Sequence, residues 1–223
     1  MCLQNRVMPD GTIVAVPTRG LFMGNRGRIH DSATKQLLNR GWTLKAWLIC
    51  ATSFNGRRRA LMSVNSYTEL FFLDEVTAFA AGHRPCYECR RQAFRAYSQA
   101  WKDGFELHTL PTAAQIDLAL HAERLERKSK RTHLLPRDTL PSGAMIDHDG
   151  FHYALCGEAF LQWNSAGYAP EPHPVSRFPQ MVKVLTPPST LAVLRAGYQP
   201  VWHQSGTSLA PVWHESAHQP SMK

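Results

Sequence analysis

The chain has 223 residues, of which 43% are hydrophobic and 19% charged, and its formal net charge is +8. This composition excludes an intrinsically disordered chain and allows a buried core in one domain or in two closely packed halves. The positive charge favours a polyanionic partner, and nucleic acid is the first candidate. No long Lys-rich amphipathic helix supports an acidic membrane surface as the partner instead.

The five cysteines do not form the dense, paired framework of a small secreted domain. The first eleven residues lack the apolar segment of a signal peptide, and no apolar run has the length of a bilayer span. We therefore expect a cytoplasmic protein with reduced thiols and no membrane contact.

Short strands and turns are expected in the first third of the chain. Residues 12–16, 46–50 and 70–73 have the β-branched and aromatic composition of strands. A Gly-rich stretch occupies residues 20–30. Asn55-Gly56 is typical of a hairpin turn, which predicts that the strand at 46–50 pairs with the segment that follows the turn.

Three helices are expected in the middle of the chain. The first spans residues 75–81, with Asp74 as its N-cap and Gly82 at its end. The second follows Cys89. The third runs over residues 112–130 and ends in a strongly basic segment.

Beyond residue 134 the chain is rich in Pro and Gly, and the segments 145–146, 151–155 and 160–163 predict a small antiparallel meander. One pattern occurs twice. A strand and a short helix lead to Ala81-Gly82, and a second strand and helix lead to Ala196-Gly197. Duplication of a unit and chance recurrence of a common helix end both explain this pattern.

Cys86 and Cys89 form a Cys-x-x-Cys knuckle, in which two thiolates from one tight turn point at one ion. Redox motifs share this spacing. Redox pairs, however, lie at a helix start after a hydrophobic strand, whereas this pair follows Gly-His-Arg-Pro. The context therefore favours a metal site.

Residues 69–91, which read ELFFLDEVTAFAAGHRPCYECRR, resemble the second half of the zinc-binding domain of the Ada DNA-repair protein. Residues 22–30 are similar to the Gly-Asn…His entry of stand-alone relatives of that domain. The similarity covers roughly residues 20–91, and its motif-level match lies in the last third. The resemblance implies a tetrahedral structural zinc and contacts to a DNA backbone.

The relatives supply two upstream ligands, commonly as a Cys-x-x-x-Cys or His-x-x-x-Cys pair. Here Thr34 stands four residues after His30, so the second ligand of that pair is missing. We predict a Zn²⁺ site completed by Cys50, with the ligands His30, Cys50, Cys86 and Cys89. Cys156 and His83 are alternative ligands. The alternative interpretation is that Cys50 is an ordinary core cysteine on a strand and that the knuckle binds no metal.

Together these features predict an α+β fold with small mixed or antiparallel sheets and three or so helices, built around a zinc knuckle. We expect an Ada-like zinc-binding and basic helical region over residues 1–132. A small β-rich region over 133–205 packs on it, and residues 206–223 form a flexible tail.

Basic and polar side chains near the knuckle and the hairpin are expected to contact phosphates. The predicted nucleic-acid contacts are Asn25, Arg26, Arg57, Arg58, Arg59, Arg84, Arg90, Arg91 and Arg95. A run of charge is also typical of a solvated face that binds nothing.

Two residues are candidates for catalysis. Cys2, once the initiator Met is removed, is an N-terminal aminothiol that can condense with the aldehyde of an abasic site. The Met1-Cys2 start is similar to that of the abasic-site-shielding family. Glu69 can activate water or stabilise an oxocarbenium-like sugar after base flipping. The alternatives are a Cys2 in a frayed terminus and a Glu69 that is an ordinary strand-end carboxylate.

The sequence thus predicts a DNA-binding zinc protein that processes damaged or chemically modified DNA, by base-excision (glycosylase-like) or abasic-site chemistry. RNA is an alternative partner. A second hypothesis is a non-enzymatic, zinc-dependent nucleic-acid-binding regulator or accessory factor. A third is an enzyme that acts on a small anionic metabolite.

Overall fold

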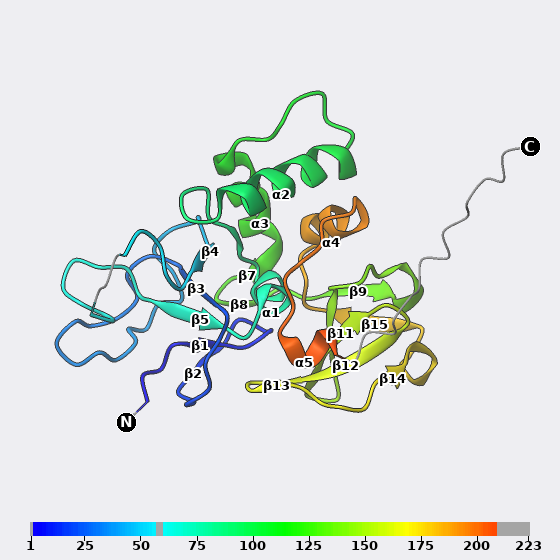
Figure 1. The fold of residues 1–223 in the computed structure, drawn as a ribbon, viewed down its shortest axis with the longest axis horizontal. Coiled ribbons are helices and arrows are strands. Elements are labelled where there is room, and N and C mark those ends of the chain that lie inside the picture. The colour runs from blue at the N-terminus through cyan, green and yellow to red at the C-terminus, as the bar shows by residue number, and fades with distance from the viewer. Residues whose placement is uncertain (1, 57–59, 209–223) are drawn as a thin grey trace, which may run out of the picture.

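The fold is α+β, as predicted, in a computed structural model that describes residues 2–56 and 60–208. Two sheets lie side by side, and the short helix α1 (Glu75–Ala80) lies between them (Figure 1). Helix α1 contributes Phe79 to the core of the first sheet and Val76 to the core of the second. Among the described residues, no helix combines the length and the apolar character needed to span a membrane.

The first sheet is six-stranded and mixed. Its strands, in spatial order, are β2 (Ile13–Val14), β1 (Arg6–Val7), β5 (Leu70–Phe72), β3 (Phe22–Asn25), β4 (Leu48–Ala51) and β6 (Arg84–Pro85). The pairs β1–β5 and β4–β6 are parallel, and the other pairs are antiparallel.

Strand β3 lies inside this sheet, although the sequence showed only a Gly-rich stretch there. Gly24 explains the difference, because a Cβ atom at this position would lie 2.0 Å from the Leu48 carbonyl oxygen and 2.7 Å from the Phe72 ring. The absence of a side chain lets these groups approach. The predicted hairpin after Asn55-Gly56 is wrong, since β4 pairs with β3 and β6 instead.

The two faces of the first sheet have different neighbours. On one face, Ile49, Leu70 and Phe72 are fully buried and pack with residues of the helices, including Tyr97 and Leu120. Successive side chains of a strand point to opposite faces. The opposite face therefore carries the alternate residues of the same strands, such as Met23, Cys50 and Phe71.

Helices α2 (Arg91–Gly104) and α3 (Ala113–Arg124) cover the first sheet, and residues of α4 (Pro188–Arg195) pack in the same core. The short helix α5 (Gln204–Thr207) contacts the second sheet at Tyr168. Helix α3 ends six residues before its predicted end. Arg124 is fully buried and donates hydrogen bonds to the carbonyls of Gly82 (2.9 Å) and Lys45 (2.6 Å). The chain then turns back as the hairpin β7 (Leu125–Glu126) and β8 (Ser129–Lys130).

The second sheet is seven-stranded, with two short 3-10 helices, η1 (Arg137–Thr139) and η2 (Val175–Arg177), in its connections. Its strands are β9 (His133–Pro136), β10 (Met145–His148), β11 (Phe151–Cys156), β12 (Ala159–Asn164), β13 (Gly167–Tyr168), β14 (His173–Pro174) and β15 (Met181–Val184). Strands β10, β11 and β12 form the predicted antiparallel meander.

The repeated pattern in the sequence corresponds to a repeated helix end. Gly82 after α1 and Gly197 after α4 both have left-handed φ values, +86° and +97°. The next backbone N–H reaches back in the same way, from His83 to the Ala78 carbonyl and from Tyr198 to the Val193 carbonyl. The two helices thus end in the same turn.

Candidate metal centre and adjoining cavity

Three cysteines, one on β4 and two in the turn between β6 and α2, converge at the edge of the first sheet. The sulfur atoms of Cys50, Cys86 and Cys89 all lie within 4.8 Å of one another and can hold a metal ion. Cys50 is on β4, and Cys86 directly follows β6, which runs parallel to β4. The Cys86 backbone N–H donates to the Ile49 carbonyl at 2.9 Å. Cys89 completes the turn that leads into α2. The predicted joining of Cys50 to the knuckle is confirmed.

The contacts among the three thiols shift the pKa of Cys86 and the pKa of Cys50 in opposite directions. Hydrogen bonding by the Cys50 thiol, then by the Cys89 thiol and nearby backbone N–H groups, holds the pKa of Cys86 well below its usual value, although burial acts in the opposite direction. The same contact with Cys86 is the main cause that raises the pKa of Cys50. A thiolate is thus favoured at Cys86, which is the protonation state that metal binding requires.

A cavity of about 230 Å³ opens beside the three cysteines. Part of its lining follows the two-residue period of the strands, since seven of the lining residues come from alternate positions on one face of the sheet. They are Met23 and Asn25 on β3, Leu48 and Cys50 on β4, and Tyr67, Glu69 and Phe71 on and before β5. This face is opposite to the one that packs on the helices.

Glu69 lies in the wall of this cavity and is buried, with 3% of its surface exposed. Among the described residues that line the cavity, no other buried carboxylate is present. One carboxylate oxygen accepts a hydrogen bond from the Met62 backbone N–H at 2.7 Å, and the other from the Ser66 hydroxyl at 3.0 Å. These bonds fix the orientation of the group, while each oxygen keeps a lone pair for another donor. The structure therefore brings Glu69 into one cavity with the three cysteines.

Asn25 supplies a donor to the same cavity. Its side-chain oxygen accepts from the Gly27 backbone N–H at 3.3 Å. Its amide nitrogen has no hydrogen-bond partner in the described part of the chain. The predicted contact at Asn25 thus lies where a small ligand in the cavity would meet it.

His30 does not join the three cysteines, so the predicted fourth ligand is wrong. The ring is buried, and its Nδ1 lies 2.7 Å from the Thr68 hydroxyl, while its Nε2 lies 3.4 Å from the Ser63 carbonyl. Both ring nitrogens thus have local partners. Within residues 2–56 and 60–208, no other His, Cys, Asp or Glu completes the group.

The two alternative ligands are also elsewhere. The His83 ring contacts the Arg26 guanidinium at 3.0 Å and the Leu48 carbonyl at 3.2 Å. Cys156 is buried in the core of the second sheet. Neither belongs to the group of thiols.

Three of the predicted phosphate-binding arginines have internal partners instead. Arg84 is 4% exposed and makes a two-bond ion pair with Asp117, at 2.9 and 2.6 Å. Arg26 is buried against the Trp47 ring, 4.0 Å from its centroid. Arg90 pairs with Glu75 at 2.6 Å. These arginines stabilise the fold through contacts within the chain. Helices and loops cover the positions at which the sequence predicted a basic surface.

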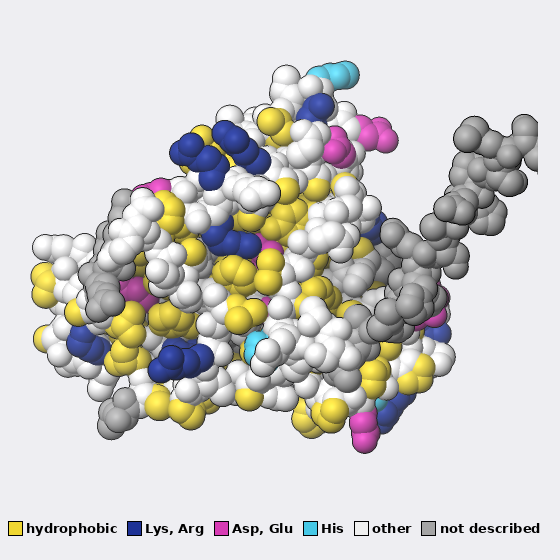
Figure 2. All heavy atoms as spheres, viewed as in Figure 1, with side chains coloured by type: hydrophobic (Ala, Val, Ile, Leu, Met, Phe, Trp, Pro, Cys, Tyr) yellow, Lys and Arg dark blue, Asp and Glu magenta, His cyan; other side chains and the backbone are white. Residues whose placement is uncertain are grey.

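Arg91 and Arg95 are exposed on α2, as their predicted role requires. Arg57, Arg58 and Arg59 lie outside the described residues, so their role stays a prediction. Figure 2 shows dark-blue side chains over the N-terminal end of α2 and, separately, over the β1–β2 edge of the first sheet.

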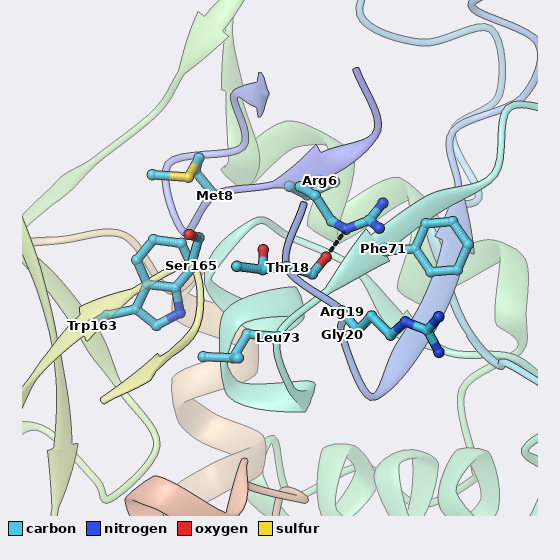
Figure 3. A pocket seen from close by; sticks show the side chains of 10 residues that line it. Arg6, Met8, Thr18, Arg19, Gly20, Phe71, Leu73, Trp163 and Ser165 are labelled. Atoms are coloured by element: carbon cyan, nitrogen blue, oxygen red, sulfur yellow. Dashed lines mark hydrogen bonds between the residues drawn. The ribbon is translucent and has the colours of Figure 1, made fainter. Parts of the chain in front are cut away.

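Cys2, the other catalytic candidate, is exposed and does not line the cavity. Four residues after Cys2, Arg6 lies on β1. Figure 3 shows the small hollow beside this segment, lined by Arg6, Arg19 and Trp163 among others. The hollow has a volume of about 10 Å³, which is room for about one water molecule.

The sequence prediction missed most of the cavity wall. Tyr67, Glu69 and Phe71 occur at every second position, and this alternation was the available signal that they share one face. Glu69 was singled out as the catalytic candidate, because it carries a titratable group. The contributions of Met23 and Leu48 depend on the register of β3 and β4, which the sequence did not reveal.

The chain matches no protein-family model, and neither curated proteins nor solved structures gave a match. The resemblance of residues 69–91 to the Ada zinc-binding domain therefore stays a prediction.

Proposed function

We propose that the chain is a zinc protein that binds DNA and hydrolytically processes a damaged or chemically modified nucleotide. The observation that carries this proposal is that three thiols close enough to hold a metal ion and a fixed carboxylate, Glu69, line one cavity. Three protein ligands with a fourth position open to a cavity are typical of catalytic zinc, whereas four are typical of structural zinc. This differs from the structural zinc implied by the resemblance.

The donor set fits zinc. Three sulfur ligands select soft metals, and zinc is the common tetrahedral choice among them. Cys50, Cys86 and Cys89 would hold the ion. When bound there, zinc would supply a Lewis acid that polarises an oxygen atom of water or substrate.

The size and the walls of the cavity favour a single nucleobase as the group that enters. About 230 Å³ is less than the roughly 300–1,000 Å³ of sites for drug-sized ligands. Phe71 and Tyr67 supply aromatic walls, and the Asn25 amide supplies a donor. A base in a duplex reaches such a site only after it is flipped out of the stack.

Glu69 would act as the base in a base-excision reaction. Its carboxylate accepts a proton from water as the water oxygen bonds to C1′ of the sugar. The bond from C1′ to the base nitrogen breaks, and the departing base takes up a proton from solvent. General-base catalysis of this kind contributes about 10²–10⁴-fold to a rate.

The first prediction concerns the metal. Purified protein contains one zinc per chain, and Cys86→Ser lowers zinc affinity by more than about 100-fold, because one of three thiolate ligands is lost. Cys156→Ser is the matched control, since this buried cysteine lies in the other core, and it retains full zinc. Zinc content is measured by elemental analysis after dialysis. Equal zinc in both variants would contradict the site.

The second prediction concerns Glu69. DNA duplexes with alkylated, oxidised, deaminated or abasic positions are incubated with the protein, and released bases and alkali-labile breaks are quantified. Glu69→Gln slows product formation by at least about 100-fold while zinc content and DNA affinity stay unchanged. The exposed Glu158→Gln serves as control. If the wild type alters none of these substrates, the catalytic proposal fails.

A non-enzymatic role has one observation in its favour, which is that both oxygens of Glu69 already accept hydrogen bonds within the chain. A carboxylate whose only role is to stabilise a loop has such contacts. In that case DNA binding depends on zinc, and Glu69→Gln lowers the unfolding temperature without any activity to lose.

A further inference from the structure

A single row of paired residues crosses the first sheet from β1, the neighbour of the edge strand β2, to Cys50 in the group of three cysteines. Arg6 on β1 pairs with Phe71 on β5, Phe71 with Met23 on β3, and Met23 with Cys50 on β4. Directly paired residues lie on the same face of a sheet. The face that carries the cavity therefore continues to Arg6.

Two arginines stand at the far end of this row. The guanidinium of Arg6 lies 4.8 Å from the centroid of the Phe71 ring. Figure 3 shows the Arg6 and Arg19 side chains on either side of Phe71, which belongs to the wall of the cavity as well. The aromatic ring thus joins the basic pair to the candidate site.

The pair has unused donors. Arg6 donates from Nε to the Thr18 carbonyl and from Nη1 to the Asn5 side chain, and its Nη2 has no partner among the described residues. Arg19 is exposed and makes no hydrogen bond or ion pair within the described chain. No carboxylate in that part of the chain forms an ion pair with either guanidinium. Two adjacent cations without an acidic partner favour an anion from outside.

We propose that Arg6 and Arg19 bind the sugar–phosphate chain of single-stranded DNA, with Phe71 as a stacking platform, and so lead a strand toward the cavity. This inference rests on the proposed function and names the form of DNA that its site receives. Aromatic rings beside basic grooves are the usual means of binding single strands without sequence preference.

The distance along the row fits such a strand. Arg6 and Cys50 are three strand spacings apart, which is roughly 14 Å at about 4.8 Å per spacing. This equals the rise of about four stacked nucleotides. A strand whose phosphate contacts Arg6 would therefore present a base to the cavity within a few nucleotides.

The experiment measures the salt dependence of binding. A fluorescently labelled 12-nucleotide single strand is titrated with the protein between 50 and 200 mM salt, and anisotropy gives Kd. Arg19→Gln weakens binding about fivefold at 50 mM salt, and the slope of log K against log salt falls by about 0.7 for the lost phosphate contact. Arg6→Gln has the same effect, and Arg6→Lys, which keeps the charge, restores most of the slope. Arg127→Gln, an exposed arginine in the β7–β8 hairpin, leaves both quantities unchanged.

Wild-type Kd and slope in both Arg6→Gln and Arg19→Gln would overturn the inference. Glu69→Gln in the same titration separates it from the proposed function. If the arginine variants bind like the wild type but Glu69→Gln still loses product formation, only the strand path is wrong. If the arginine variants weaken binding and the wild type releases no product, the strand path stands and the catalytic proposal fails. If the wild type does not bind the single strand, the strand path is wrong.

Discussion

Lys130 illustrates how a single residue can make stability depend on pH. It lies in the β7–β8 hairpin, and its ammonium group donates to the Ala80 carbonyl. Burial, followed by the charges of Arg26 and Arg124, lowers the pKa of Lys130 to about 7. The Asp10 carboxylate opposes this shift only weakly. The folded protein thus holds this amine in its neutral form over much of the alkaline range.

The direction of the pH effect follows from linkage. In the unfolded chain the Lys130 amine has its ordinary pKa of about 10.4, so between about pH 7 and 10 the unfolded chain binds more protons than the folded one. Stability therefore rises with pH across this window, and the destabilising effect of the charged amine is fully present below pH 7.

We predict that Lys130→Met flattens this rise and makes the protein more stable than the wild type at pH 6. Urea unfolding at pH 6, 8 and 9.5 measures the effect. Lys128→Met is the matched control, because Lys128 is exposed in the same hairpin and should leave the pH profile unchanged. Parallel profiles for the wild type and Lys130→Met would show that the amine keeps its ordinary pKa in the folded state.

At the scale of elements, the N-terminus of α1 is the point at which hydrogen bonds link the two sheets. Asp74 caps the helix, as the sequence predicted, by accepting from the Thr77 N–H at 2.8 Å. The same carboxylate accepts from the Tyr168 hydroxyl (2.8 Å) on β13 and from the His203 N–H (3.1 Å). Burial raises the pKa of Asp74 even though these bonds act against the shift. The Asp74 side chain thus accepts hydrogen bonds from three segments, which are α1, β13 and the chain at His203.

This predicts that Asp74→Asn destabilises the protein more than loss of an ordinary cap does. The amide can still accept from Thr77, but its NH₂ group cannot accept from Tyr168 and His203, which leaves buried donors unpaired at about 1–3 kcal/mol. Thr112→Ala, which removes the N-cap of α3, costs about 1 kcal/mol. Chemical unfolding of both variants measures the two free energies. A smaller loss for Asp74→Asn would mean that its bonds beyond α1 contribute little.

Elements with a local signal were predictable from the sequence, and those defined by distant partners were not. Asp74 and the Gly82 turn act within a few residues, so α1 was located within one residue at its end. The end of α3 depends on Arg124 contacts to Gly82 and Lys45, far away in the sequence. Strand β3 depends on the close approach of Phe72 to Gly24. Neither contact can be inferred before the chain is folded.

For the whole molecule, the same limit applies to the candidate site. The knuckle at Cys86 and Cys89 is contiguous in the sequence, and Cys50 was named as its partner. His30 was predicted as a metal ligand from a family pattern, whereas its two ring nitrogens contact the Thr68 hydroxyl and the Ser63 carbonyl. Net charge indicated a basic surface but could not distinguish buried arginines from exposed ones. Arg84 and Arg26 proved internal, while Arg6 and Arg19 were not considered.

The two-sided character of the first sheet has a practical consequence for engineering. Positions 24, 49, 70 and 72 face the helices, and positions 23, 25, 48, 50, 69 and 71 face the cavity. Because the two sets alternate along the same strands, a library restricted to positions 23, 25, 48 and 71, which leaves Cys50 and Glu69 in place, can vary ligand preference without changing the hydrophobic packing that keeps the protein folded.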